Sequence, residues 1–179
     1  MGVAGLFGIK NPAQAQSLAA AASTAPAELA QVQPALALRG RSTLTFFGMA
    51  IYEASLWAPP NFALDRFEAH PFALELHYRR SLTGNLIAQR SVYEMQRQSG
   101  FDARRASEWE ARMQALFPDV KAGDRITGIY QPGVGARFAV NGKAVGEVRD
   151  ALFARLFFGI WLSPQTSEPA MRCALAACS

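Results

Sequence analysis

The sequence predicts a domain of the α+β class, in which strands and helices are segregated along the chain. Half of the 179 residues are apolar and 18% are charged, a composition typical of globular proteins that bury a core. The hydrophobic pattern has a period of two residues in some stretches and about 3.6 in others, as strands and helices require. These stretches follow the order strands, two helices, strands, two helices, which favours α+β over alternating βαβ units.

The first strands are predicted from residue 36 onward. In 36–46, apolar side chains occupy even positions and polar side chains odd positions, the pattern of a half-buried strand. The even positions carry Leu36, Leu38, Leu44 and Phe46, and the odd ones Arg39, Arg41, Thr43 and Thr45. We expect the even set in the core. A second strand is predicted at 49–57, where two prolines follow, and the most regular alternation marks a third at 72–78.

The next two elements are predicted to be helices. In 83–98, Ala88, Val92 and Met95 recur on one helical face, and a glycine follows as a stop signal. Asp102 can cap a second amphipathic helix, which ends near Phe117.

Three short strands and two helices complete the prediction. The strands lie at 124–131, 136–140 and 143–148, and Asn141-Gly142 between the last two is a strong hairpin signal. Asp150 can cap a helix that is apolar nearly all round and is therefore expected to be buried. A terminal helix is predicted from 167 to 176.

Residues 1–35 differ in composition from the rest and are interpreted as a weak or truncated export signal or a linker. They contain two charges, and Gly2–Ile9 is a short apolar stretch, although the basic residues that normally precede one are missing. An Ala-rich helical arm is the alternative. The folded domain is then predicted at 36–179, with residues 1 to about 30 adding nothing to it. We expect a periplasmic or exported protein, with a cytoplasmic one as the alternative.

Composition and motifs exclude several classes of function. The longest strongly apolar stretch near the end, 156–162, is far shorter than the roughly 20 residues of a transmembrane helix. The net charge of +4 is spread along the chain without a basic stripe, so nucleic-acid binding is not expected. His70 and His77 are an odd number of residues apart, and Cys173 and Cys178 lack CxxC spacing. We therefore expect no metal and no cofactor.

Four stretches of the sequence resemble the chalcone isomerase-like family. They are GRSTLTFFGMAIYEASLW (40–57), FALELHYRRSLTGNLIAQRSVYEM (72–95), LFPDVKAGDRITGIYQPGVGARFAVNGKAVGEVRD (116–150) and LFFGIWLSPQTSEP (156–169). Their order and spacing, over about four fifths of the chain, carry the resemblance. It implies an open-faced β-sandwich, a large antiparallel sheet with helices packed on one face. Bacterial members of this subgroup are usually exported.

The resemblance argues against chalcone cyclisation. Plant enzymes of the family use an arginine, a threonine and a tyrosine around a cleft. Here the tyrosine position falls on Ile87, counted from the Leu82-Thr83-Gly84 turn, and the threonine position falls on Tyr52. The arginine matches Arg41 or, less well, Arg39. We therefore assign no catalytic residue.

Family members that bind fatty acids hold the carboxylate with an arginine and a tyrosine, which implies candidate ligand-binding residues here. Arg41 could fill this role together with Tyr52 or Tyr78. Surface charge for the arginine and core packing for the tyrosines are the alternatives. Arg90 is a further candidate, although its i, i+4 spacing from Glu94 also suits a solvated ion-pair face.

The leading hypothesis is non-enzymatic binding of a small apolar ligand, with or without a carboxylate, in a cleft between sheet and helices. One alternative is an isomerase or lyase acting on an enone or phenolic compound, with Tyr52 or Tyr78 as proton donor and Arg41 as electrophile. Another is a protein-interaction domain without a cleft. The sequence makes no prediction about the oligomeric state.

Overall fold

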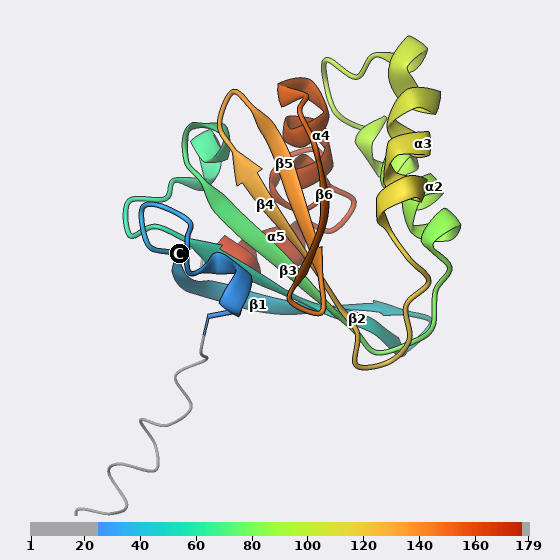
Figure 1. Cartoon of the computed structure of the whole chain (residues 1–179), viewed down its shortest axis with the longest axis horizontal. Helices are drawn as coiled ribbons and strands as arrows, with labels where there is room; N and C mark the ends of the chain where they lie inside the picture. The colour runs from blue at the N-terminus through green and yellow to red at the C-terminus, as the bar shows by residue number, and fades with distance from the viewer. Residues whose placement is uncertain (1–24, 177–179) are drawn as a thin grey trace, which may run out of the picture.

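The computed structural model describes residues 25–176, whose strands form a six-stranded antiparallel sheet (Figure 1). Neighbouring strands in the sheet are also neighbours in the chain, in the order β1 to β6. The strands are Ala37–Phe46 (β1), Met49–Ala58 (β2), Phe72–Tyr78 (β3), Arg125–Gln131 (β4), Gly135–Val140 (β5) and Lys143–Val148 (β6). The predicted fold class, α+β with helices on one face of a large antiparallel sheet, is confirmed.

Helices cover one face of this sheet, which we call the inner face. The described helices are α2 (Gly84–Met95), α3 (Ala106–Leu116), α4 (Ala151–Leu162) and α5 (Pro169–Ala176). Short 3-10 helices are η1 (Ala27–Leu29), η2 (Leu64–Ala69) and η3 (Ala103–Arg105). Helix α4 contacts β4 and β5, α5 contacts β1 and β2, and α2 packs against α3 and α4. The buried side chains of α4 join the main core, as its apolar pattern predicts.

Local signals in the sequence explain where several elements begin. The Thr83 side chain accepts a hydrogen bond from the Leu86 amide and caps α2. Asp102 caps η3, the turn that leads into α3, rather than α3 itself. Asn141 and Gly142 both have positive φ, as a two-residue hairpin of this kind requires.

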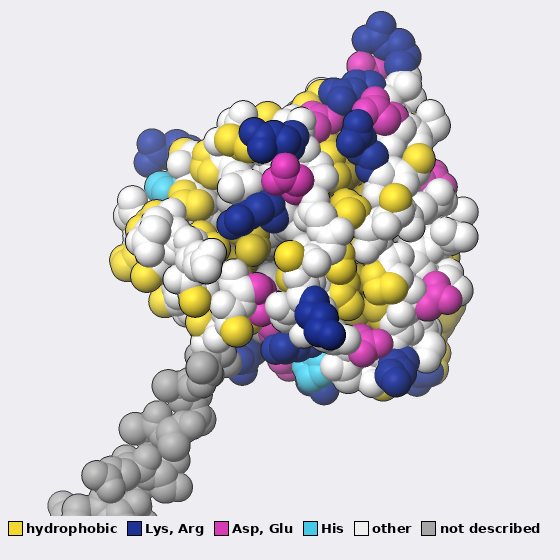
Figure 2. Space-filling view, in the orientation of Figure 1, with side chains coloured by type: hydrophobic (Ala, Val, Ile, Leu, Met, Phe, Trp, Pro, Cys, Tyr) yellow, Lys and Arg dark blue, Asp and Glu magenta, His cyan; other side chains and the backbone are white. Residues whose placement is uncertain are grey.

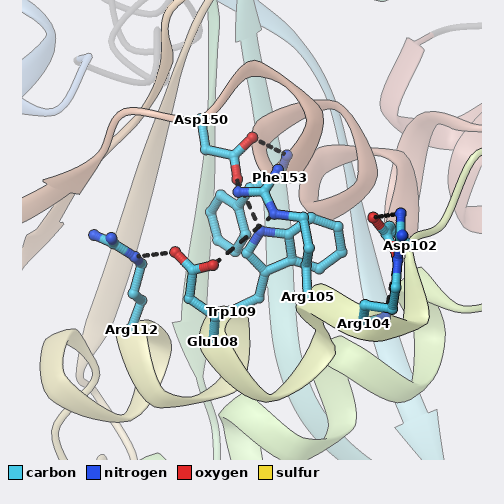
Figure 3. A network of polar contacts seen from close by, with 8 residues as sticks. All are labelled: Asp102, Arg104, Arg105, Glu108, Trp109, Arg112, Asp150 and Phe153. Atoms are coloured by element: carbon cyan, nitrogen blue, oxygen red, sulfur yellow. Dashed lines mark hydrogen bonds and ion pairs between the residues drawn. The ribbon is translucent and has the colours of Figure 1, made fainter.

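Asp150 caps α4 and also connects α4 to α3 (Figure 3). One carboxylate oxygen accepts a hydrogen bond of 3.1 Å from the Phe153 amide. The other accepts from the Arg105 guanidinium at 2.6 Å and from the Trp109 indole at 2.8 Å. Figure 3 shows the Arg105 side chain, from the end of η3, and the Trp109 side chain, from α3, converging on Asp150. This carboxylate therefore fixes α3 relative to the helix that covers the sheet.

A β-bulge in β1 divides its apolar residues between the two faces of the sheet. The register shifts between Leu38, which pairs with Trp57, and Gly40, which pairs with Leu56. As a result Leu38 packs with Trp57 on the outer face, whereas Leu44 packs against the main core on the inner face. The expectation that all even positions share one core face is corrected by the bulge. At the end of the strand, Phe46 is 61% exposed.

The outer face has its own small core, to which residues before the predicted domain boundary contribute. Leu29 and Val32 are buried there against Trp57, Ala73 and Ile129. In the same segment, Glu28 accepts a hydrogen bond of 2.6 Å from the Thr127 hydroxyl on β4. The folded part of the chain therefore begins before residue 36, and residues 25–35 belong to it. Most of the stretch interpreted as an export signal, 1–24, lies outside the described residues.

Charged side chains of both signs are mixed over the surface in view. On the face shown in Figure 2, Lys and Arg side chains lie beside Asp and Glu side chains rather than forming one basic patch. In the described part of the chain, none of the helices has the length and apolarity to span a bilayer.

Candidate functional site

A cavity of about 350 Å³ lies between the inner face of the sheet and helices α2 and α4. Strands β1, β2 and β3 form one wall, and most of the lining side chains are apolar. Representative ones are Leu44, Ile51, Leu76, Ile87, Phe157 and Ile160. The size and the apolar wall are typical of sites that bind small molecules.

Two tyrosines supply hydroxyl groups to the cavity. Tyr52 on β2 and Tyr78 on β3 are direct cross-strand partners, with ring centroids 5.9 Å apart. Both line the cavity. Their side chains share the inner face because residues paired in antiparallel register project to the same side of a sheet.

The tyrosine hydroxyls stay protonated at neutral pH. Burial raises the pKa of Tyr52 to about 12, even though a hydrogen bond from Trp161 lowers it. Burial raises the pKa of Tyr78 further above its usual range, and the neighbouring Tyr52 adds to this. The Trp161 indole N–H on α4 donates to the Tyr52 oxygen at 3.1 Å, which leaves the hydroxyl hydrogen of Tyr52 available to another acceptor.

An ion pair on α2 forms a polar part of the cavity wall. The Arg90 guanidinium and the Glu94 carboxylate, one helical turn apart, are 2.6 Å apart. The Arg90 side chain is 66% exposed, whereas that of Glu94 is 8% exposed. Arg97 approaches the second Glu94 oxygen, Oε2, at 3.8 Å, but that buried oxygen has no hydrogen bond. The solvated ion-pair interpretation therefore needs correction for Glu94, because α2 turns this residue toward the cavity.

Within residues 25–176, no cluster of His, Cys, Asp and Glu side chains has a geometry that could hold a metal ion. Cys173 is exposed on α5, and Cys178 lies outside the described residues.

Comparison with known proteins agrees with the resemblance seen in the sequence. A family model described as chalcone isomerase-like matches residues 16–175. This chain belongs to the chalcone isomerase-like family. An uncharacterized protein of Haemophilus influenzae is 31% identical over 97 residues, which cover 54% of this chain and 47% of that protein. The match thus spans about half the length of this curated relative.

A solved structure shows the same fold as this chalcone isomerase-like chain. The crystal structure of a fatty-acid binding protein from Arabidopsis thaliana superimposes with a TM-score of 0.61. The match covers 81% of this chain and 88% of that one, at 12% sequence identity. At this identity the likeness concerns the fold.

The chalcone isomerase-like fold brings three of the four predicted ligand-binding residues together. Tyr52, Tyr78 and Arg90 all line the cavity, and their contact with a ligand stays a prediction. Ile87, at the position matched to the family's tyrosine, also lines it.

Arg41, the fourth predicted residue, lies on the outer face of the sheet, opposite the cavity. It pairs in register with Ser55, which in turn pairs with Glu75 on β3. Burial raises the pKa of Glu75, while Arg125 and Arg41 lower it, which places Arg41 in the electrostatic environment of that carboxylate. The expectation that Arg41 shares a site with Tyr52 or Tyr78 is therefore corrected, since strand alternation sends their side chains to opposite faces.

Several polar residues of the cavity were not among the predicted candidates, and three of them are charged or carry an indole N–H. Trp161 belongs to a stretch interpreted as buried core, Glu94 to a presumed solvated face, and Glu168 to the start of the terminal helix. An N–H on an otherwise apolar helix is a signal that could have identified Trp161, because a buried indole needs an acceptor. No local signal distinguishes Glu94 from the exposed glutamates of α3.

Proposed function

We propose that this chain is a non-enzymatic binding protein, which holds a small and mainly apolar molecule in the cavity between the sheet and α2. The observation that carries the proposal is the cavity itself, with its apolar wall and a few convergent polar groups from Tyr52, Tyr78 and the Arg90–Glu94 pair. The shared fold with a protein named for fatty-acid binding supports ligand binding in general.

Two features favour binding over catalysis at this site. Ile87, at the position of the family's tyrosine, has no group that can transfer a proton. A proton donor works best when its pKa lies near the operating pH, and the pKa of Tyr52 is raised to about 12. An isomerase that depends on this tyrosine would therefore be slow at neutral pH. A protein-interaction domain with a filled core is disfavoured by the open cavity.

Native mass spectrometry of the protein purified from its own host tests whether a ligand is bound. A bound small molecule should add mass under native conditions and be lost after denaturation. Extraction and fragmentation of the released molecule would identify its class. A single unliganded mass, repeated at several growth conditions, would count against the proposal.

A fluorescent probe tests whether binding occurs in this cavity. N-phenyl-1-naphthylamine is uncharged at pH 7 and brightens in apolar surroundings. Ile87→Trp fills the cavity from α2 and should weaken probe binding at least about tenfold, because overpacking removes the space that the probe needs. Val145→Trp on β6, an exposed residue outside the cavity wall, is the matched control and should leave binding unchanged. Equal binding by both variants would place the probe elsewhere.

We further propose that the protein is exported to the periplasm or beyond, with residues 1–35 including the export signal. The Ala-rich composition and the apolar Gly2–Ile9 stretch support this proposal. N-terminal sequencing of the protein isolated from fractionated cells tests it. Removal of residues before about 25 in the exported fraction is expected, whereas an intact N-terminus in the cytoplasmic fraction would contradict it.

A further inference from the structure

The wall of the cavity contains more acidic than basic side chains. In the described part of the chain, its ionisable groups other than the tyrosines are Arg90, Glu94 and Glu168. Arg90 already pairs with Glu94 at 2.6 Å, while Glu168 has no ion-pair partner among residues 25–176. The formal charge of these three groups is therefore −1, with two carboxylates and one guanidinium.

Glu94 in addition has a buried oxygen with unused hydrogen-bonding capacity. Its side chain is 8% exposed, and Oε2 accepts no hydrogen bond although Arg97 approaches it at 3.8 Å. A buried acceptor without a hydrogen bond costs free energy. Because the protein encloses Oε2, a donor group of a ligand recovers this cost only after the Glu94 carboxylate rotates toward the cavity. Another carboxylate cannot donate that hydrogen bond at neutral pH.

The surroundings of the Tyr52 hydroxyl also disfavour a negatively charged ligand group. After burial, the carboxylates of Glu168 and Glu94 both raise the pKa of this hydroxyl. Arg90 lowers it, but by less than either carboxylate raises it. A negative charge placed beside this hydroxyl is therefore disfavoured by its surroundings, in the same way as the tyrosinate is.

Arg41 does not offset the excess of negative charge in the cavity wall. It lies on the outer face of the sheet, near Glu75, and does not line the cavity. The resemblance assigns Arg41 the role of a carboxylate anchor. In the structure, the sheet lies between the Arg41 side chain and the cavity.

We propose that the cavity selects an apolar molecule whose polar end is an amine or a hydroxyl group, and that Glu94 disfavours ligands ending in a carboxylate. The inference rests on the proposed binding function and specifies the chemical class of its ligand. An ammonium or hydroxyl group would donate to Glu94, while the Tyr52 and Tyr78 hydroxyls remain available to a neutral oxygen or nitrogen.

Three probes of equal chain length test the proposal on the full-length protein: decylamine, decan-1-ol and decanoate. Each displaces N-phenyl-1-naphthylamine at pH 7.5, at concentrations below micelle formation. We expect decylamine to bind at least about tenfold more tightly than decanoate, as one unit of charge in a partly buried site implies, with decan-1-ol between them. Decanoate binding as tightly as decylamine would overturn the proposal.

Charge-removing variants assign the preference to Glu94. Glu94→Gln should reduce the amine-to-carboxylate affinity ratio about tenfold or more and leave decan-1-ol binding within about threefold. Glu147→Gln, on exposed β6 and outside the cavity wall, is the control and should leave the ratio unchanged. An unchanged ratio in a folded Glu94→Gln protein would refute the role of Glu94. If this variant does not fold, Glu168→Gln, at an exposed position of the cavity wall, tests by the same ratio whether the wall carboxylates disfavour decanoate, and an unchanged ratio there would overturn the selection by charge.

The two proposals fail in different ways. Binding of decan-1-ol with no preference for the amine over the carboxylate leaves the binding function intact and rejects the selection by charge. Failure of the uncharged decan-1-ol and of the fluorescent probe to bind rejects the binding function, and with it the inference built on it.

Discussion

The indole N–H of Trp161 on α4 donates a hydrogen bond to the hydroxyl oxygen of Tyr52 on β2, across 3.1 Å. This bond joins the helical layer to the sheet at the wall of the cavity. Tyr52 in turn packs edge-on against Tyr78, with ring planes at 69°. The position of α4 and the orientation of two cavity side chains are thus linked.

Removal of the Tyr52 hydroxyl should therefore weaken the fold as well as the cavity. In Tyr52→Phe, the mostly buried Trp161 indole N–H loses its acceptor, and we expect unfolding to become easier by about 1 to 2 kcal/mol. Urea unfolding measures this change. Tyr93→Phe, at a 55% exposed position on α2, is the matched control and should change stability by less than about 0.5 kcal/mol. Equal effects of the two variants would show that the bond contributes little.

The protein should not accelerate the cyclisation of chalcones. Ile87 stands where the family's tyrosine is expected, and the neighbouring tyrosine hydroxyls are held in their protonated form by burial. The loss of chalcone absorbance, followed with and without protein, should proceed at the spontaneous rate. Turnover well above that rate, abolished by Tyr52→Phe, would instead identify an enzyme.

Leu29 should contribute to the stability of the whole domain. It is 4% exposed on the outer face, in a segment that was expected to lie outside the fold. Leu29→Ala should destabilise the protein by about 2 to 3 kcal/mol, through lost burial and the cavity left behind. Thermal and urea unfolding provide the measurement. Gln31→Ala, at a neighbouring exposed position, is the control. A similarly small effect of both variants would indicate that the residues before 36 are a linker that does not stabilise the domain.

Asp150 should make the free energy of unfolding depend on pH in the acidic range. Burial raises the pKa of this carboxyl, but hydrogen bonds from the Phe153 amide and the Trp109 indole, together with Arg105, outweigh burial and hold it below the usual 3.8. A pKa depressed by folding stabilises the protein above about pH 4, and the contribution is lost as the pH falls through the lower value of the folded state.

Asp150→Asn tests this dependence. At pH 7 it should be less stable by about 1 to 2 kcal/mol, since the neutral amide lacks the negative charge that is favourable at the N-terminus of α4 and cannot form an ion pair with Arg105. Between pH 4 and 2 its stability should fall less steeply than that of the wild type, when denaturant unfolding is measured at each pH. Asp65→Asn, at an exposed position in η2, should follow the wild-type curve. Parallel curves for Asp150→Asn and the wild type would contradict the prediction.

The sequence alone determined most of the secondary structure, because the signals that specify it are local. A period of two residues located the strands, the Asn141-Gly142 turn located the last hairpin, and Asp150 located the start of α4. The family, and through it the layered fold, also followed from the order of motifs along the chain. These inferences need no knowledge of which surfaces meet.

The tertiary structure alone decided which side chains form the candidate site. Strand alternation assigned Arg41 and Leu44 to opposite faces of the sheet. Only the structure shows that the cavity lies on the face of Leu44, so that Arg41 does not line it. The bulge near Arg39 changed the face of Leu38 with no signal in the apolar pattern. Glu94 and Trp161 acquired their roles only when α2 and α4 packed beside Tyr52, because burial and electrostatic environment are properties of the assembled layers and not of the sequence pattern of any one element.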